Sequence, residues 1–391
     1  MHPNWLLPEF VDDVLPREAK RVELIRRKVL DLFAVHGYEL VSPPLIEYLE
    51  SLLTGSGQDL ELQTFKLVDQ MSGKTLGIRA DLTPQIARLD AHLLDDPGVT
   101  RLCYADRVIK TRPAEGDMSR EAVQLGAELF GCSKISADIE INRLMIQSIR
   151  LVVNRPLTID LGSVSIAQSV SDWLKLDINQ SISFFEALQT KDTAALKEFS
   201  MDYEEGAQKI IMALPRLYGD VSILDTARDV LTGVPGAGQG IDELRNVYQS
   251  IKDEVDHVIL DLAELRGFRY HSGMVVSVYV EGETSPIARG GRYDHVGESF
   301  GRSRPATGFT IDLRRLTQCA SQLALEESQR KIWAPCTHDD SDLLEKMKSL
   351  RQSGDIVVED LLGEEMDLGS QGYTHKLVKD AQSWSVVSLN N

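Results

Sequence analysis

The residues with the clearest chemical potential lie in the segment EAVQLGAELFG, residues 121–131. As a β-strand, this segment places Gln124, Gly126 and Glu128 on one face and apolar side chains on the other. A carboxylate that faces a pocket needs a cationic partner, so an amide and a carboxylate beside a glycine can hold an ammonium group. Glycine within a strand also often marks the close approach of a ligand or of another backbone. On the pattern alone, an ordinary half-buried strand with one solvated face is the simpler explanation.

A second polar pair lies in the alternating segment LGIRADLT, residues 76–83. Asp81 and Thr83 fall on its polar side and resemble the first pair in chemistry. The side chain of Thr83 has another possible role, as the N-cap of a helix that opens at Pro84. The two roles are compatible.

Further along the chain, the motifs RGFRYH and GGRYD supply groups that suit a planar, charged ligand. Arg266 can neutralise a carboxylate through a bidentate contact. Tyr270, His271 and Tyr293 can stack on a planar ring and hydrogen-bond to its nitrogen atoms. Taken one at a time, such residues more often belong to the core or to the surface.

The chain of 391 residues has a net charge of −18, which disfavours a polyanionic partner unless basic residues gather locally. Residues 171–256 carry a net charge of −8 and residues 321–391 a net charge of −6. We find no apolar run near the length of about 20 residues that spans a membrane, and no secretory signal at the N-terminus. The composition is typical of a globular protein.

The four cysteines lack the spacing of a metal clip or of a CxxC pair. We interpret them as reduced thiols of a cytoplasmic protein. The eight histidines form no HExxH motif and no close pair. The sequence therefore predicts no metal site and no cofactor.

The elements that must position these groups follow no regular strand–helix alternation. Residues 16–36 form a strong helix candidate, because apolar residues recur at helical spacing and Pro16 and Gly37 suit its two ends. Strands are predicted at RLCYA, AVQLGAELFG, LTIDLGSV, GMVVSVYVEG and GFTIDL. Hairpins and long excursions join them, which favours an α+β fold with an antiparallel sheet flanked by helices.

Two other parts of the chain differ from this pattern. Residues 171–256 consist mainly of predicted amphipathic helices, for example at 204–219 and 241–262, and form a helical insertion in a core of residues 1–325. The stretch GVPGAGQG lies between these helices and lacks the Lys-Ser/Thr of a phosphate loop, so we expect a turn. Residues 326–391 form a small C-terminal α/β segment, with strands at DIVVEDLL and WSVVSLNN.

Together and in order, these segments resemble the histidyl branch of class II aminoacyl-tRNA synthetases. The matches run through roughly residues 1–325 and comprise LPREA, IRADLTPQIAR, VIKTRP, QLGAELFG, RGFRYH and GGRYDHVGESFGRSRPATGFTIDLRRL. GGRYD with a downstream GF, combined with QLGxExFG, is highly specific for this family. The resemblance implies a class II synthetase-like antiparallel sheet and a homodimer.

The resemblance also implies a histidine-binding site. The matching residues are Asp81, Thr83, Gln124, Glu128, Arg266, Tyr270, His271 and Tyr293. In the family, the first four surround the amino group, the arginine lies on the carboxylate side, and the aromatic residues close on the imidazole. The chain departs from the family twice, since Asp81 stands where glutamate is commoner and His271 where a second tyrosine is usual.

The hairpin that grips ATP in the synthetases has changed. The family carries a phenylalanine-arginine-x-glutamate run whose arginine binds the α-phosphate. Aligned on the Arg-Pro that follows, this run becomes Val108, Ile109, Lys110 and Thr111. Loss of a preorganised transition-state cation costs about 3–4 kcal/mol. Arg107 and Lys110 lie nearby and could restore a cation, and Arg315 still matches the downstream class II arginine.

The chain keeps the histidine pocket, has an altered hairpin, and is acidic where the synthetases bind tRNA. In this combination it resembles a paralogous family, the regulatory subunits of ATP phosphoribosyltransferase. This resemblance implies a non-catalytic chain that activates a short-form catalytic subunit in the first step of histidine biosynthesis and transmits feedback inhibition by L-histidine. It implies a homodimer within a hetero-oligomer, expected to be a hetero-octamer, with no tRNA and no membrane partner. Two alternatives stay open: a divergent histidine–tRNA ligase, and a histidine-sensing module for another partner.

Overall fold

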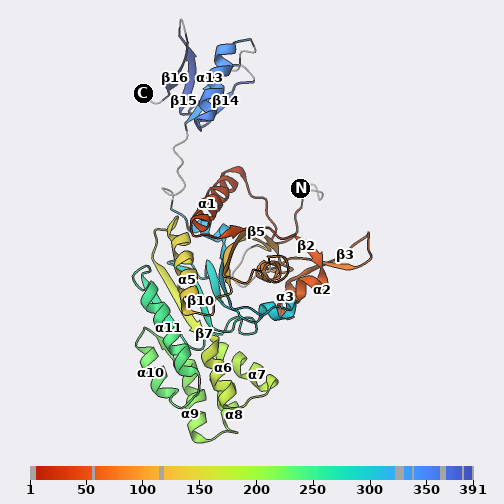
Figure 1. Cartoon of the computed structure of the whole chain (residues 1–391). Coiled ribbons are helices and arrows are strands. Elements are labelled where there is room, and N and C mark those ends of the chain that lie inside the picture. The colour runs from red at the N-terminus through yellow and green to blue at the C-terminus, as the bar shows by residue number, and fades with distance from the viewer. Residues whose placement is uncertain are drawn as a thin grey trace. The chain divides into compact units, whose positions relative to one another are not determined.

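A computed structural model describes residues 6–54, 58–94, 96–113, 119–321, 330–336, 339–361, 367–380 and 383–389. The chain divides into two compact units, Met1–Leu325 and Glu326–Asn391 (Figure 1). The boundary between them lies outside the described residues. No helix within the described ranges is both long and apolar enough to cross a membrane.

A nine-stranded sheet forms the centre of the first unit, in the order β1-β5-β6-β12-β11-β10-β7-β9-β8. Its strands are β1 (Glu39–Leu40), β5 (Thr100–Ile109), β6 (Glu121–Phe130), β7 (Leu157–Ser163), β8 (Tyr218–Gly219), β9 (His257–Asp261), β10 (Met274–Val280), β11 (Ala288–Arg292) and β12 (Ala306–Asp312). Neighbours are antiparallel except for β1 with β5 and β7 with β9. The predicted antiparallel sheet is confirmed, with parallel pairs toward its two edges.

Helices cover the apolar face of this sheet. They are α1 (Pro16–Val35), α5 (Ile135–Arg150), α11 (Ala237–Ile251) and α12 (Leu313–Cys319). Leu125, Ala127 and Leu129, which alternate along β6, are fully buried in the same core cluster as residues of α1 and α5. The polar residues between them therefore face the opposite side of the sheet.

Helix α1 shows how local sequence sets an element. Pro16 occupies its first turn, where the missing N–H costs no hydrogen bond. Ile25, Val29 and Phe33 form its buried stripe. Gly37 follows the helix with a φ of +82°, a left-handed conformation that favours glycine. The helix predicted over 16–36 is confirmed.

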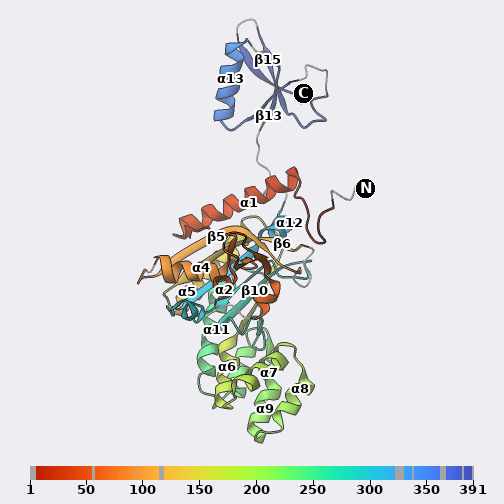
Figure 2. The same cartoon turned by 90° about the vertical axis from the view of Figure 1, so that its right-hand side faces the viewer.

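The first unit contains further helices and helical turns. They are α2 (Leu49–Leu53), α3 (Gln58–Gln63), α4 (Thr83–Leu89), α6 (Val164–Trp173), α7 (Ile178–Gln189), α8 (Thr193–Ser200), α9 (Glu205–Ala213) and α10 (Ile223–Val230), with a π-helical turn η2 (Asp90–Leu94) and 3-10 turns η3 (Leu214–Arg216) and η4 (Val296–Phe300). In both views of the molecule, α6 to α10 gather at one end of the first unit, away from α1 (Figure 2).

The predicted helix over 241–262 is wrong in its second half. Helix α11 ends at Ile251, and His257–Asp261 form strand β9, which pairs in parallel with β7. Val258 and Leu260 alternate with more exposed neighbours, and Leu260 is fully buried. In so short a segment, the spacing of apolar residues fits both a helix and a strand. The segment forms a strand because it pairs with the edge of β7. Strand β8, within the insertion, and strand β9, directly after it, therefore extend the sheet.

A second, three-stranded sheet forms from residues 46–78 of the first unit. Its strands are β2 (Ile46–Tyr48), β3 (Phe65–Val68) and β4 (Thr75–Ile78), in the order β2-β4-β3. The alternating segment predicted over 76–83 stays a strand only to Ile78, and Thr83 already belongs to α4.

The second unit is a four-stranded sheet with one helix. The elements are β13 (Lys331–Ala334), α13 (Ser341–Gln352), β14 (Ile356–Glu359), β15 (His375–Lys379) and β16 (Trp384–Ser388), with strand order β14-β13-β15-β16. Ile332, Leu343 and Leu377 lie in its own hydrophobic core. The small α/β character is confirmed, although β13 and β15 were not predicted. Leu362 and Asn390–Asn391, at the ends of the two predicted strands, lie outside the described residues.

Candidate functional site

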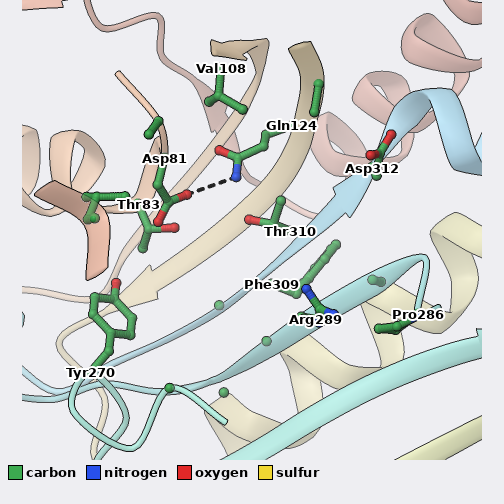
Figure 3. A pocket seen from close by; sticks show the side chains of 18 of the residues that line it. Asp81, Thr83, Val108, Gln124, Tyr270, Pro286, Arg289, Phe309, Thr310 and Asp312 are labelled. Atoms are coloured by element: carbon green, nitrogen blue, oxygen red, sulfur yellow. Dashed lines mark hydrogen bonds between the residues drawn. The ribbon is translucent and has the colours of Figure 1, made fainter. Parts of the chain in front are cut away.

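A cavity of about 500 Å³ lies over the polar face of the central sheet. Its walls come from β6, β11 and β12, from the start of α4, and from the loop before β10 (Figure 3). Seven of the eight residues predicted to bind a ligand line it: Asp81, Thr83, Gln124, Glu128, Tyr270, His271 and Tyr293. The sheet thus brings together side chains that are more than 200 positions apart in the sequence.

Glu128 is the most buried acid of the cavity, with 1% of its surface exposed. The hydroxyl of Tyr104 donates to its Oε1 at 3.0 Å, and the hydroxyl of Tyr293 donates to its Oε2. Burial raises the pKa of Glu128 to about 8, and the nearby carboxylate of Asp81 acts in the same direction. A cationic ligand group would stabilise the ionised form of this carboxyl.

Gln124 holds Asp81 in place. Its Nε2 donates to Oδ1 of Asp81 at 2.9 Å, the contact drawn in Figure 3. The backbone N–H of Leu82 donates to Oε1 of Gln124 and to Oδ1 of Asp81, each at 2.9 Å. The amide of Gln124 is therefore oriented by the chain at the start of α4, and it positions the carboxylate beside it.

The N-cap interpretation of Thr83 is wrong. The N-cap residue of α4 is Leu82, and Thr83 is the first residue of the helix, with Pro84 after it. The Thr83 side chain is instead nearly buried at the cavity wall, where it lies near the hydroxyl of Tyr270 (Figure 3).

Two stacked tyrosines form the aromatic wall. The rings of Tyr270 and Tyr293 lie 5.0 Å apart at an interplanar angle of 29°. The hydroxyl oxygen of Tyr270 is buried without a hydrogen-bond partner among the described residues. A buried polar group without a partner is costly, so this hydroxyl is suited to a ligand that donates or accepts a hydrogen bond.

His271 contributes a neutral ring to the same wall. Burial lowers the pKa of its imidazole to about 4. Its Nδ1 lies 3.3 Å from the backbone carbonyl oxygen of Arg292. The ring packs over Gly291, where a Cβ atom would come within 2.8 Å of Nδ1. A neutral histidine at this position adds no charge to the acidic end of the cavity.

Two glycines, one on β6 and one on β12, make room for side chains around the cavity. A Cβ atom on Gly126 would collide with the ring of Tyr104 and the backbone of Phe309, and a Cβ atom on Gly308 would collide with the carboxyl of Glu128. Glycine in these strands thus allows the close approach of protein groups.

Tyr104 is a site residue that sequence reasoning missed. It is fully buried, directly opposite Gly126 in the pairing of β5 with β6. Its hydroxyl also lies 2.6 Å from Oγ1 of Thr310. A large aromatic residue across an antiparallel pair from a glycine is a recognisable sequence signal, because the ring covers the space that glycine leaves.

Arg266 is the one predicted residue that the structure does not bring into the cavity. Its Nε donates to both carboxylate oxygens of Glu264, at 2.9 and 3.0 Å, and its Nη2 donates to Oε2 at 2.6 Å. Nη2 also lies 3.3 Å from the hydroxyl of Tyr279. These contacts raise the pKa of Arg266 and hold it outside the lining. The cations that do line the cavity are Lys110, Arg120, Arg269, Arg289 and Arg315.

Of the four altered hairpin residues, Val108 and Lys110 line the cavity, whereas Ile109 and Thr111 do not. The N–H of Ile109 donates to the carbonyl of Arg79 at 3.1 Å, and the hydroxyl of Thr111 donates to the carbonyl of Leu62 at 2.7 Å. Neither residue is among the described residues that line the cavity. Arg107 pairs with Glu121 and is also outside the lining. Of the two nearby cations, Lys110 therefore remains at the cavity. Residues 114–118 lie outside the described residues.

The arginine of the GGRYD motif has a structural role. Nη2 of Arg292 lies 2.6 Å from Oδ2 of Asp138 on α5, and both side chains are almost fully buried. Its Nη1 also donates to Asp294 at 3.1 Å, and Asp294 accepts from the N–H of Ala306 at 3.0 Å. This network fixes Tyr293, the neighbour of Arg292, against the cavity.

Two family models match the chain. The model described as histidyl-tRNA synthetase matches residues 10–316. The model described as ATP phosphoribosyltransferase subunit HisZ C-terminal domain matches residues 329–387. The two matches together cover most of both compact units.

Curated relatives match over nearly the full length. An ATP phosphoribosyltransferase regulatory subunit from Cupriavidus pinatubonensis is 45% identical over 386 residues, which cover 99% of each chain. A protein with the same description from Nitrosospira multiformis is 45% identical over 388 residues, covering 98% of each chain.

Solved structures share the fold. The structure of an ATP phosphoribosyltransferase regulatory subunit/histidyl-tRNA synthetase from Bacillus halodurans has a TM-score of 0.78 at 26% identity and covers 94% of this chain and 95% of its own. Histidyl-tRNA synthetase from Nostoc has a TM-score of 0.77 at 18% identity, covering 96% of this chain and 91% of its own, and shows the fold alone. With full-length relatives at 45% identity and a matching C-terminal model, the chain belongs to the family of ATP phosphoribosyltransferase regulatory subunits, built on a histidyl-tRNA synthetase-like fold.

Proposed function

We propose that this chain is a non-catalytic regulatory subunit that binds L-histidine, activates a short-form ATP phosphoribosyltransferase catalytic subunit and transmits feedback inhibition to it. Membership of the family of regulatory subunits supports the role in the complex. The cavity on the polar face of the sheet supports the ligand. The proposal includes a homodimer within a hetero-octamer and a cytoplasmic location.

The proposal that the ligand is histidine rests on the burial of Glu128 and on its hydrogen bonds. A carboxyl with 1% exposure, held by two tyrosine hydroxyls beside a second carboxylate, is suited to a ligand that brings positive charge or N–H donors. Free histidine offers both an ammonium group and imidazole N–H groups. The unpartnered hydroxyl of Tyr270 lies in the same cavity and can complete the recognition of the ring.

The proposed binding residues divide into three roles. Asp81, Thr83 and Glu128 provide oxygen atoms for the ligand. Gln124 acts by holding Asp81, as its hydrogen bonds indicate. Tyr270, His271 and Tyr293 form the ring wall.

The absence of catalysis is part of the same proposal. An arginine that stabilises the transferring phosphate in the transition state is worth about 3–4 kcal/mol, and Ile109 stands at the matching position. Inhibition at a distant active site requires a coupling free energy of roughly 1–3 kcal/mol between the two sites. L-Histidine must therefore bind the inhibited assembly better than the active one.

The proposal is tested by co-expression with a short-form catalytic subunit. Phosphoribosyl transfer to ATP is measured for the catalytic subunit alone, for the complex, and for the complex with increasing L-histidine. We expect a higher rate in the complex and inhibition by histidine. If this chain neither changes the turnover of its partner nor confers histidine sensitivity, the regulatory role is wrong.

A divergent histidine–tRNA ligase is the second candidate, and two observations favour it. The histidyl-tRNA synthetase model spans 10–316, and Lys110 and Arg315 place cations at the cavity. Histidine-dependent exchange of pyrophosphate into ATP by the isolated chain would support ligase chemistry. We expect none. Recovery of a different partner from native extract would instead support a sensing module in another complex.

A further inference from the structure

The cavity has charge of opposite sign on different walls. Asp81 and Glu128 supply carboxyl groups on one wall, and the other charged residues of the described lining are Asp312 and five basic residues. A free amino acid is a zwitterion and needs a partner for its carboxylate as well as for its ammonium group. Arg266, which the sequence assigned to the carboxylate, is turned away toward Glu264.

Arg289 occupies the sheet position that suits this task. It lies on β11, where it pairs with Thr310 of β12, and Thr310 pairs with Gly126 of β6. Directly paired residues of antiparallel strands share a face, so Arg289 rises from the same face as Glu128. The two strand spacings between Arg289 and Gly126 amount to about 10 Å, and Glu128 lies two residues further along β6. One amino acid and the two side chains holding it can bridge such a span.

The side chain of Arg289 is exposed and belongs to the cavity lining. Gly291, two positions along the same face of β11, is covered by the ring of His271. Figure 3 labels Arg289 among the residues that line the cavity, together with Asp81, Gln124 and Pro286.

Other lining arginines have different surroundings. Nη2 of Arg269 donates to Glu186 of α7 at 3.0 Å. The guanidinium of Arg120 lies 4.7 Å from the ring centroid of Phe65, and its Nε donates to the carbonyl of Lys110 at 3.2 Å. Arg269 thus contacts the helical insertion, and Arg120 contacts the three-stranded sheet. Among the described arginines that line the cavity, Arg289 is the one that lies on a strand of the central sheet.

We infer that Arg289 receives the carboxylate of the bound amino acid and thereby distinguishes an amino acid from the corresponding amine. This inference rests on the proposed function, because it assigns a role within the same histidine site. A guanidinium can bind a carboxylate through two parallel hydrogen bonds, a geometry that a lysine ammonium cannot match. Arg289 is thus a specificity residue, and Arg266 is a structural partner of Glu264.

The test compares two ligands that differ only in the carboxylate. Binding of L-histidine and of histamine to the purified full-length chain is measured by calorimetry for the wild type and for Arg289→Gln. We expect the wild type to prefer L-histidine, and Arg289→Gln to weaken L-histidine binding by about tenfold or more while histamine binding stays unchanged. Arg266→Gln is the matched control and should keep the preference. Thermal melting confirms that each variant is folded.

The outcomes separate this inference from the proposed function. If the wild type binds L-histidine and Arg289→Gln keeps the full preference over histamine, the inference is overturned and the histidine site stands. A preference lost in Arg266→Gln and kept in Arg289→Gln would overturn it equally. If the wild type binds neither ligand, the histidine site fails and the inference fails with it. Should Arg289→Gln not fold, Arg289→Lys takes its place, with a reduced preference expected and an unchanged one contradicting the role.

Discussion

The deep burial of Glu128 has a measurable consequence. Its pKa rises from an ordinary value of 4.5 to about 8, chiefly because burial disfavours the ionised form. A carboxyl with a higher pKa in the folded protein than in the unfolded chain favours folding while it is protonated. The stability from this group is complete below its ordinary pKa of 4.5 and is lost as the pH rises through about 8.

Replacing Glu128 by glutamine should remove this pH dependence. In the absence of ligand, the free energy of unfolding of the wild type should fall relative to Glu128→Gln between about pH 5 and pH 8, by up to about 1.4 kcal/mol per pH unit. Urea denaturation at a series of pH values measures the difference. Parallel stability curves for the two proteins would show that Glu128 keeps an ordinary pKa.

The same substitution should weaken ligand binding more than any other single change in the cavity. Glu128→Gln keeps the shape of the side chain and removes the countercharge, so we expect L-histidine affinity to fall roughly 10- to 100-fold. Calorimetry at pH 8 provides the measurement. Glu298→Gln, which changes an exposed glutamate outside the cavity lining, serves as the control. Equal affinities for the wild type and Glu128→Gln would place the ligand elsewhere.

Strands and helices could be predicted where one period of apolar residues dominates. Helix α1 and strands β5, β6, β7, β10 and β12 belong to this class. The segment 257–261 could not be assigned, because its apolar residues fit a helix or a strand, and the choice depends on the distant edge of β7. The local pattern of residues cannot indicate pairing with a strand that is distant in the sequence.

The site was predictable to the extent that strand alternation fixes which residues share a face. That rule placed Gln124 with Glu128, and the structure brings both to the cavity. It could not show that Glu264 holds Arg266, since that contact depends on the conformation of a loop. Tyr104 was missed because the partner strand of Gly126 has to be known first.

The junction of β11 with α5 should be a major source of stability. Oδ2 of Asp138 accepts from Nη2 of Arg292 at 2.6 Å, and Asp138 is 2% exposed. Breaking one side of a buried ion pair leaves an uncompensated charge, so Asp138→Asn should cost about 3–5 kcal/mol. Urea denaturation measures the loss. Asp242→Asn breaks the exposed pair with Arg228 and should cost less than about 1 kcal/mol. Similar losses of unfolding free energy in the two variants would show that the buried ion pair of Asp138 with Arg292 is not a major source of stability.

The cavity belongs to the first compact unit. Each of the described residues that line it lies between Leu60 and Arg315. The second unit has a hydrophobic core of its own. Its acidic composition and that of the helical insertion, with net charges of −6 and −8, disfavour a polyanion at either place.

A chain that ends at Leu325 should therefore keep the histidine site. We expect its affinity for L-histidine to lie within about threefold of the full-length value, a difference of less than 1 kcal/mol. Calorimetry measures the affinity, and circular dichroism confirms the fold. Loss of binding by a well-folded first unit would mean that the C-terminal unit contributes to the site.

The proposed function places histidine binding in the cavity of this chain and catalysis in the partner subunit, whose activity the chain regulates. The most direct measurement is inhibition of phosphoribosyl transfer by L-histidine, in complexes assembled with the wild-type chain and with Glu128→Gln. We expect both chains to activate the catalytic subunit equally, and we expect the inhibition curve of Glu128→Gln to be displaced at least tenfold toward higher histidine, or about 1.4 kcal/mol. Overlapping inhibition curves, with both complexes intact, would contradict it.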